Sequence, residues 1–247
     1  MEESVRMMRI DKYLAEMGQG TRSEIKKMIR SGRVVVDGET VKKPELKIDE
    51  TVQEVSLDGK RIGYAKKEYY MLHKPAGVIS ATKDDRDKTV LDLITDKKRN
   101  DLFPVGRLDK DTEGLLLITN DGELAHRLLS PKKHVDKVYY AKVQGKVDES
   151  DVKAFADGMD IGDDTPAKSA DLRILKSGEE SEIELTITEG RFHQVKRMFQ
   201  ARDKQVIYLK RMTMGPLVLG DDLPKGTYRK LREEERKALG TDTDTER

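Results

Sequence analysis

The stretch GRLDKDTEGLLLITNDG, residues 106–122, joins two segments of opposite character. Its first half is polar and carries three carboxylates, at Asp109, Asp111 and Glu113, between basic side chains. Its second half contains a continuous apolar run at 115–118, which is typical of a buried strand, and an Asn-Asp-Gly turn signal closes it. The pattern predicts a charged loop that leads directly into a sheet.

Segments outside this stretch mix the periodicities of strands and helices. Residues 139–144 and 183–188 alternate between apolar and polar side chains, as half-buried strands do. Phe192, Val195 and Phe199 then recur at helical spacing. Because strands and helices follow one another in no regular order, the sequence predicts an α+β fold rather than a parallel doubly wound sheet.

The first sixty residues predict a small unit of two helices and a hairpin. Thr21 and Glu24 have the spacing of a capping box at the start of the second helix, and Gly32 ends that helix. Asp37 and Gly38 lie between two β-forming triplets, which predicts a tight hairpin because both turn positions need positive φ. The first helix is indicated by apolar residues at helical spacing, namely Ile10, Tyr13, Leu14 and Met17.

Basic residues outnumber acidic ones by five to one between positions 22 and 33. Four of them are spaced by four, four and three residues, so we expect them to share a helix face opposite Ile25 and Met28. Such a row can meet successive phosphates and release their counterions, although an ordinary solvated helix face has the same composition. The candidate RNA contacts are Arg22, Lys26, Lys27, Arg30 and Arg33.

The overall composition excludes several kinds of site. The 247 residues suit one large domain or two smaller ones, and a net charge of +1 means that any nucleic-acid signal must be local. Cysteine is absent, which excludes disulfides and thiolate zinc sites and fits a reducing compartment. No apolar run approaches the ~20 residues of a membrane span, and the N-terminal segment lacks the apolar core of a signal peptide. We therefore expect a soluble, cytoplasmic protein.

The carboxylates of the 106–122 loop are compatible with several roles. Arg107 and Lys110 flank Asp109 and favour its ionised form, as a nucleophile or base requires, but an ordinary charged turn fits the same residues. A glycosidase needs two opposed carboxylates, and acids on one local loop do not establish that geometry. Interleaved cations argue against Mg²⁺, the four histidines lack metal-ligand spacing, and Gly-Gln-Gly at 18–20 lacks the third glycine of a dinucleotide site. No metal is expected.

The N-terminal segment resembles a known RNA-binding module. Residues 8–55 are similar to an S4 domain through MRIDKYL at 8–14, TRSE at 21–24 and SGRVVVDG at 31–38. The resemblance implies that the basic helix face contacts RNA. S4 domains accompany many different activities, so this module alone does not identify a reaction.

The sequence Gly106-Arg-Leu-Asp109 closely resembles the catalytic motif of the pseudouridine synthases of the RsuA/RluB group. Further segments follow in the family's order, and together they extend the resemblance over most of the chain. These segments are MLHKPAG at 71–77, KVY at 137–139, EGRFHQVKRM at 189–198, and residues 211–219 and 223–231. The resemblance implies a catalytic domain built on a mixed, mainly antiparallel sheet.

The resemblance also implies roles for individual residues. Asp109 is expected to be the catalytic carboxylate, Tyr139 the active-site tyrosine and Lys196 the basic partner of Asp109. Arg107 is expected either to bind the phosphate of the flipped nucleotide or to brace the loop, and His193 is a candidate RNA contact. The reaction breaks the N1–C1′ bond and joins C5 to C1′ without net redox change or hydrolysis, so no cofactor is expected. The carboxylate could attack sugar or base, or abstract the C2′ proton.

The expected organisation is an S4-like domain at 1–60, a linker at 61–67, a catalytic domain at 68–236 and a polar tail at 237–247. Residues 192–199 look most like the RsuA branch of the group, which modifies small-subunit 16S rRNA. A uridine of 23S rRNA is the alternative substrate, and a non-catalytic RNA-binding or ribosome-assembly factor is the alternative class. The expected partner is ribosomal RNA, free or in an assembling small subunit. We expect a monomer that does not bind membranes.

Overall fold

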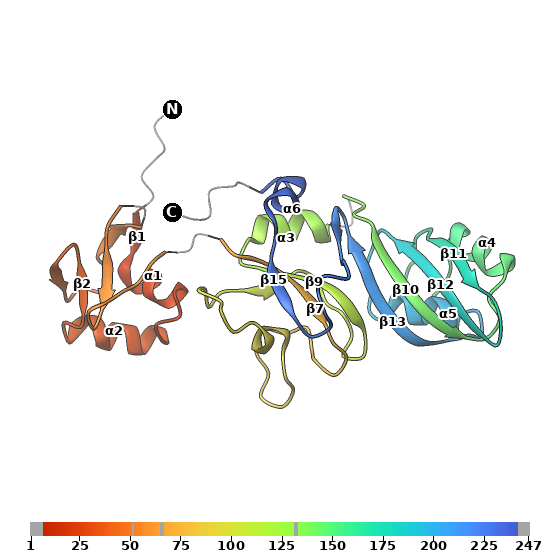
Figure 1. The fold of residues 1–247 in the computed structure, drawn as a ribbon, viewed down its shortest axis with the longest axis horizontal. Coiled ribbons are helices and arrows are strands. Elements are labelled where there is room, and N and C mark those ends of the chain that lie inside the picture. The colour runs from red at the N-terminus through yellow and green to blue at the C-terminus, as the bar shows by residue number, and fades with distance from the viewer. Residues whose placement is uncertain (1–6, 51, 65–66, 131–132, 242–247) are drawn as a thin grey trace. The chain divides into compact units, whose positions relative to one another are not determined.

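The computed structural model describes residues 7–50, 52–64, 67–130 and 133–241 (Figure 1). The chain divides into two compact units. Among the described residues, the N-terminal unit combines 7–68 with Asp96–Leu102, and the C-terminal unit combines Tyr69–Thr95 with 103–241. No helix in the described ranges has both the length and the apolar character of a membrane span.

The N-terminal unit has the predicted order of helix, helix and hairpin. The side chain of Thr21 accepts a hydrogen bond from the Glu24 amide, and the Glu24 carboxylate accepts one from the Thr21 amide at 2.8 Å, so the capping box is confirmed. The turn residues Asp37 and Gly38 have φ of 49° and 85°, as the tight hairpin requires. The elements are β1 (Met7–Arg9), α1 (Ile10–Glu16), α2 (Arg22–Arg30), β2 (Val34–Val36), β3 (Glu39–Val41), β4 (Lys47–Asp49), β5 (Val55–Leu57) and β6 (Lys60–Arg61).

The predicted linker at 61–67 begins too early. Arg61 ends strand β6, and Ile62 is buried in the core of the N-terminal unit. The Tyr13 hydroxyl donates a hydrogen bond to the Ile62 carbonyl at 2.6 Å, and the Tyr64 ring stacks on Tyr13 with centroids 5.3 Å apart. Two apolar side chains separated by one glycine are too short a pattern to show a period. Residues 65 and 66 of the predicted linker lie outside the described residues.

A second segment of the N-terminal unit comes from the middle of the chain. Arg99 is 3% exposed, its guanidinium lies 2.9 Å from the Glu16 carboxylate, and it sits over the Tyr64 ring. The Asn100 amide donates a hydrogen bond to the Glu16 carbonyl at 2.9 Å. Residues 96–102 therefore pack against α1, which no local pattern in the sequence indicated.

The C-terminal unit is built on a nine-stranded sheet, and the predicted α+β class is confirmed. The main strand order is β11-β12-β10-β13-β9-β7-β15, with β14 on β13 and β8 on β9. Every strand pairing in this sheet is antiparallel except that of β13 with β9. The strands are β7 (Tyr69–Lys74), β8 (Phe103–Pro104), β9 (Glu113–Thr119), β10 (Lys137–Gln144), β11 (Asp171–Lys176), β12 (Glu180–Ile187), β13 (Gln205–Met214), β14 (Leu217–Val218) and β15 (Tyr228–Lys230).

The parallel pairing joins the two groups of strands that Figure 1 shows, β7, β9 and β15 on one side and β10 to β13 on the other. It is short, with Glu113 opposite Lys210 and Gly114 opposite Arg211. Gly114 has a φ of +108°, and a Cβ atom there would lie 2.2 Å from the Arg211 carbonyl oxygen. Only glycine allows the strands to approach this closely, directly after the charged loop.

Helices and a short 3-10 turn complete the C-terminal unit. They are η1 (Val90–Leu93), α3 (Gly122–Leu129), α4 (Glu149–Asp157), α5 (Gln194–Gln200) and α6 (Glu233–Ala238). The predicted boundary at 236 falls inside α6, so the predicted tail at 237–247 begins too early. Leu239 is buried in the same core cluster as Leu231, and one apolar residue in a polar segment was too weak a signal. Residues 242–247 of the predicted tail lie outside the described residues.

Candidate active site

The charged loop before β9 is held by the segment that follows β7. The Ser80 hydroxyl accepts a hydrogen bond from the Leu108 amide at 3.0 Å and donates one to the Leu108 carbonyl at 2.8 Å. The Thr112 amide donates to the Asp109 carbonyl at 3.1 Å, and the Gly77 amide donates to the Lys110 carbonyl at 2.7 Å. The backbone on both sides of Asp109 is therefore fixed.

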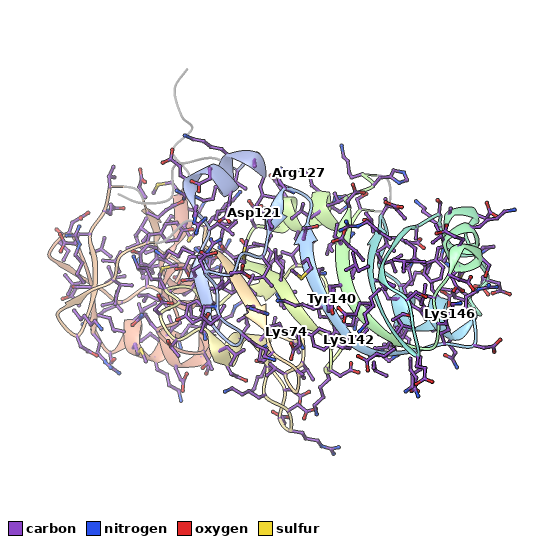
Figure 2. The ribbon with its side chains drawn as sticks, turned by 45° about the vertical axis from the view of Figure 1, so that its right-hand side comes forward. Lys74, Asp121, Arg127, Tyr140, Lys142 and Lys146 are labelled. Atoms are coloured by element: carbon purple, nitrogen blue, oxygen red, sulfur yellow. The ribbon has the colours of Figure 1, made fainter. Side chains whose placement is uncertain are left out.

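Lys74, labelled in Figure 2, is the last residue of β7 and holds the same loop through its side chain. Its side chain is fully buried, and its ammonium nitrogen lies 3.0 Å from the Asp109 carbonyl oxygen and 2.9 Å from that of Thr112. The carbonyls of Pro75 and Lys110 lie at 3.1 and 3.3 Å. Burial lowers the pKa of Lys74 to about 8. Lys74 lies within one of the motifs that carry the family resemblance, but the sequence indicated no role for it.

The structure brings Asp109 and Lys196 together, as the family resemblance implied. The Lys196 ammonium, on helix α5, lies 3.1 Å from the Asp109 carboxylate and 2.6 Å from that of Asp111. The imidazole Nε2 of His193 lies 3.5 Å from the other carboxylate oxygen of Asp109. The Asp109 side chain is 25% exposed, so it remains reachable from solvent.

The Lys196 ammonium is stabilised in its charged form. Partial burial opposes the charge, but hydrogen bonds with Asp111 and Asp109 outweigh it and raise the pKa of Lys196. Partial burial also opposes ionisation of Asp111, and the hydrogen bond from Lys196 lowers the pKa of Asp111 nonetheless. A cation that resists deprotonation therefore lies beside the Asp109 carboxylate.

A pocket of about 60 Å³ opens beside this ion pair. Asp109, Arg107 and Lys196 form its charged wall, while Ile187 and Leu209 contribute apolar surface from the sheet. A flat ring with polar edges matches such a lining, because the apolar side receives its face and the charged side its polar atoms.

Tyr139 also lines the pocket, from strand β10. It lies opposite Leu185 of β12 and Arg211 of β13, and it is 7% exposed. Spacing alone would place this tyrosine in the core, whereas the family motif implies the active site. In the structure the residue is buried and also borders the pocket.

Arg107 is exposed and forms part of the pocket wall. In the described part of the chain its guanidinium has no ion pair and no side-chain hydrogen bond. Of the two roles expected for Arg107, bracing the loop has no supporting contact here.

The segment that presents His193 and Lys196 is fixed by two arginines. Arg191 donates hydrogen bonds to the carbonyls of Thr165 and Pro166 at 2.6 and 2.8 Å. Arg197 forms an ion pair with Asp163 at 2.6 Å. The sequence showed these arginines only as cations beside Lys196, because their partners lie about thirty residues away in a different loop.

The predicted basic face in the N-terminal unit is largely present. Ile25 and Ile29 are buried on one side of α2, and cations point outward on the other. Arg33 differs from the prediction, because α2 ends at Arg30 and the Arg33 guanidinium forms a two-point ion pair with Asp58. The exposed cations on α2 itself are Arg22, Lys26, Lys27 and Arg30.

Across the ranges that the structure describes, no group of three histidine or acidic side chains is arranged to hold a metal ion. The pocket at Asp109 offers cations, an apolar wall and an aromatic ring as its binding chemistry.

Comparison with known proteins adds family information. Residues 68–201 match the family described as RNA pseudouridylate synthase, and residues 8–53 match the S4 domain family. The chain is 46% identical over 231 residues to the uncharacterized RNA pseudouridine synthase YtzG of Bacillus subtilis, and the match covers 92% of this chain and 96% of that protein. It is 40% identical over 229 residues to Ribosomal small subunit pseudouridine synthase A of Vibrio parahaemolyticus, covering 92% and 97%.

The fold has a solved relative as well. A crystal structure described as that of a pseudouridylate synthase superposes with a TM-score of 0.66 at 37% sequence identity. The match covers 94% of this chain and 99% of that one. Similarity in sequence and in structure thus extends over both units of the chain.

Proposed function

We propose that Asp109 is the catalytic carboxylate of this chain, which belongs to the RNA pseudouridine synthase family. We propose further that its substrate is a uridine of small-subunit rRNA. Family membership makes the chain an isomerase that converts uridine in RNA to pseudouridine. The assignment of Asp109 depends chiefly on one observation, the 3.1 Å contact between Lys196 and Asp109 at the edge of the pocket.

The chemistry requires an ionised carboxylate near C1′ and the uracil ring. Lys196 places a cation 3.1 Å from the Asp109 carboxylate, and the apolar wall formed by Ile187 and Leu209 limits access of water to the reacting bond. Loop contacts through Lys74 and Ser80 fix the carboxylate before the substrate arrives. Such positioning lowers the barrier because no reorganisation of the loop is needed during the reaction.

Tyr139 is placed to hold the detached base. Its ring borders the pocket and supplies a flat face on which uracil can stack while it turns from N1 to C5 attachment. The Tyr139 hydroxyl forms no hydrogen bond within the described residues. It is therefore available to the polar edge of the base and to the proton that leaves C5.

The target uridine must leave its helical stack before it can enter the pocket, at a cost of a few kcal/mol. Arg107 is suited to offset part of this cost by binding the phosphate of the extruded nucleotide, because it is exposed at the pocket wall and no carboxylate of the described chain engages it.

The basic face of α2 supplies binding energy from a second unit of the chain. Arg22, Lys26 and Arg30 follow the spacing of one helix face, and all are exposed. Such a face gains affinity by displacing counterions from successive phosphates, independent of base sequence. Lys27 borders this face, and Arg33, held by Asp58, contributes less to RNA binding.

Small-subunit rRNA is favoured by the relatives. The Vibrio protein, 40% identical over 92% of this chain, is named for the ribosomal small subunit. Residues 192–199, FHQVKRMF, resemble the RsuA branch at the segment that carries Lys196. The substrate is the free rRNA or the same rRNA within an assembling subunit.

Pseudouridine mapping of rRNA from cells with and without the gene tests the substrate directly. We expect one 16S position to lose its pseudouridine in the deletion strain and regain it when the wild-type gene is restored. Complementation with an Asp109→Asn gene should leave that position unmodified. Loss of a 23S pseudouridine instead would refute the small-subunit assignment, and an unchanged set in both rRNAs would refute the rRNA substrate.

A further inference from the structure

Phe192 is 71% exposed and precedes His193, which lines the pocket, whereas the other phenylalanines of the chain are buried or half-buried. Helical spacing predicted that it would share a buried face with Val195 and Phe199, but α5 begins only at Gln194 and Phe192 lies outside that face. Its ring instead stacks on His193, with centroids 3.8 Å apart and planes 17° from parallel. One face of the Phe192 ring is therefore covered by imidazole.

The backbone that carries this stack is fixed rather than loose. The Phe192 carbonyl accepts a hydrogen bond from the Arg197 guanidinium at 2.8 Å, and the Arg191 amide donates to the Gln194 side chain at 3.0 Å. His193 has a φ of 48°, a left-handed conformation that costs energy for a residue other than glycine. The Phe192 ring is therefore held exposed to solvent by a fixed backbone that includes the strained His193. This combination indicates a binding role for the ring.

The charge around the stack indicates what it binds. His193 lines the pocket and lies 3.5 Å from Asp109, so the stack stands beside the place where the target base must enter. Arg107 and Lys196 border the same pocket. A planar aromatic surface next to a group of cations matches a nucleobase and its phosphate.

We propose that the Phe192–His193 stack takes the place of the extruded uridine and stacks on the neighbouring nucleobase of the RNA. This inference rests on the proposed function, because it requires a base to leave its stack and enter the pocket beside Asp109. Extrusion exposes a face of the adjacent base, and an apolar ring inserted there removes that face from water. Phe192 is then a substrate-positioning residue that opposes return of the target base.

The expected loss on removing the Phe192 ring follows from the free energy of stacking between an aromatic ring and a base. Removal of an aromatic ring that stacks on a base weakens binding by about 5- to 150-fold. We expect Phe192→Ala to lower kcat/KM for rRNA within this range. Phe192→Tyr should restore activity and Phe192→Leu should not, because leucine keeps apolar volume without a stacking face. A role limited to covering His193 would let leucine serve as well as tyrosine.

The chain contains no tryptophan, so Phe192→Trp introduces a single indole at the proposed contact, and indole can be excited selectively over the eight tyrosines. In an Asp109→Asn background, which blocks turnover, we expect a full-length 16S rRNA transcript to quench the emission of the introduced indole. Leu175→Trp is the matched control, since Leu175 is 46% exposed on β11 and lies two strands away from the strand that carries Tyr139. The emission of this control should change little, and its activity without the Asp109 substitution should remain that of the wild type.

The outcomes separate this inference from the function on which it rests. Wild-type activity of Phe192→Trp together with unquenched indole emission, while filter binding shows the RNA bound, would overturn the stacking role alone. Full activity of Phe192→Ala on naked rRNA would do the same and would leave a protein partner as the reason for the exposed ring. Absence of pseudouridine formation by the wild-type protein on every rRNA would overturn the proposed function itself.

Discussion

Lys74→Met tests whether the buried ammonium positions the loop that carries Asp109. The substitution keeps the length and apolar stem of the side chain but removes the donor that reaches the Asp109 and Thr112 carbonyls at 3.0 and 2.9 Å. Lys110→Met is the matched control on the same loop. Lys110 is half exposed and pairs with Asp87 at 2.7 Å, an interaction worth about 0–1 kcal/mol at the surface.

The expected change in the free energy of unfolding follows from the number of hydrogen bonds that the Lys74 ammonium donates. An ammonium donates three hydrogen bonds, and each buried carbonyl left without its donor costs about 1–3 kcal/mol. The wild-type protein bears the cost of burying the Lys74 charge, as its lowered pKa shows, and methionine removes that cost. This gain opposes the loss of hydrogen bonds to the carbonyls. We therefore expect only a small change in the free energy of unfolding. A shift of about 1 Å in the loop that carries Asp109 would lower kcat by about 100-fold.

Tritium release from an rRNA transcript labelled at uridine C5 measures the reaction, because the C5 hydrogen leaves when C5 joins C1′. We expect the single-turnover rate of Lys74→Met to fall about 100-fold while RNA affinity stays within about 3-fold. Lys110→Met should retain the wild-type rate within about 2-fold. A Lys74→Met enzyme that turns over at the wild-type rate would show that the loop does not depend on the ammonium.

Three further predictions concern pH, salt and packing. Burial lowers the pKa of Lys74 to about 8, so its ammonium is present below that pH and lost above it. The single-turnover rate should therefore decline as pH rises through 8, and a flat rate profile from pH 7 to about 9.5 would contradict this. Lys26→Glu with Arg30→Glu should flatten the slope of log K against log salt by about 1.4–1.8, and an unchanged slope would show that this face does not contact the RNA. Gly114→Ala should lower the melting temperature by roughly 6–12 °C or more, for a cost of at least about 3 kcal/mol, because its Cβ would lie 2.2 Å from a backbone oxygen of β13. Gly122→Ala, with open space around its Cβ, should melt like the wild type.

Features that depend on neighbouring residues were predictable from the sequence. The Thr21–Glu24 capping box and the hairpin at Asp37-Gly38 are set by hydrogen bonds and dihedral angles within four residues. The apolar run at 115–118 predicted the interior of β9, because a strand buried on both faces needs no alternation. The family motifs then brought Asp109 and Lys196 together correctly, although they lie far apart in the chain.

Features that depend on distant partners were not predictable in this way. The lysine at position 74 could equally have ended a strand in solvent, and only the tertiary structure supplies the carbonyls that surround it. The ion pair between Arg33 and Asp58 links positions 25 apart and removes one cation from the expected basic row. Phe192 was misassigned because periodicity cannot show where a helix begins when the residue before it adopts a left-handed conformation.

We propose that Asp109 carries out the isomerisation, whereas RNA binding depends on other residues of the pocket and on the basic face of α2. Asp109→Asn preserves the size of the side chain and removes its charge, so folding and the contacts of α2 should persist. Pseudouridine formation and RNA affinity, measured together on the same 16S rRNA transcript, test the claim most directly. We expect no detectable pseudouridine over many enzyme equivalents and an affinity within about 3-fold of the wild type. Pseudouridine formation at the wild-type rate by Asp109→Asn would contradict the account.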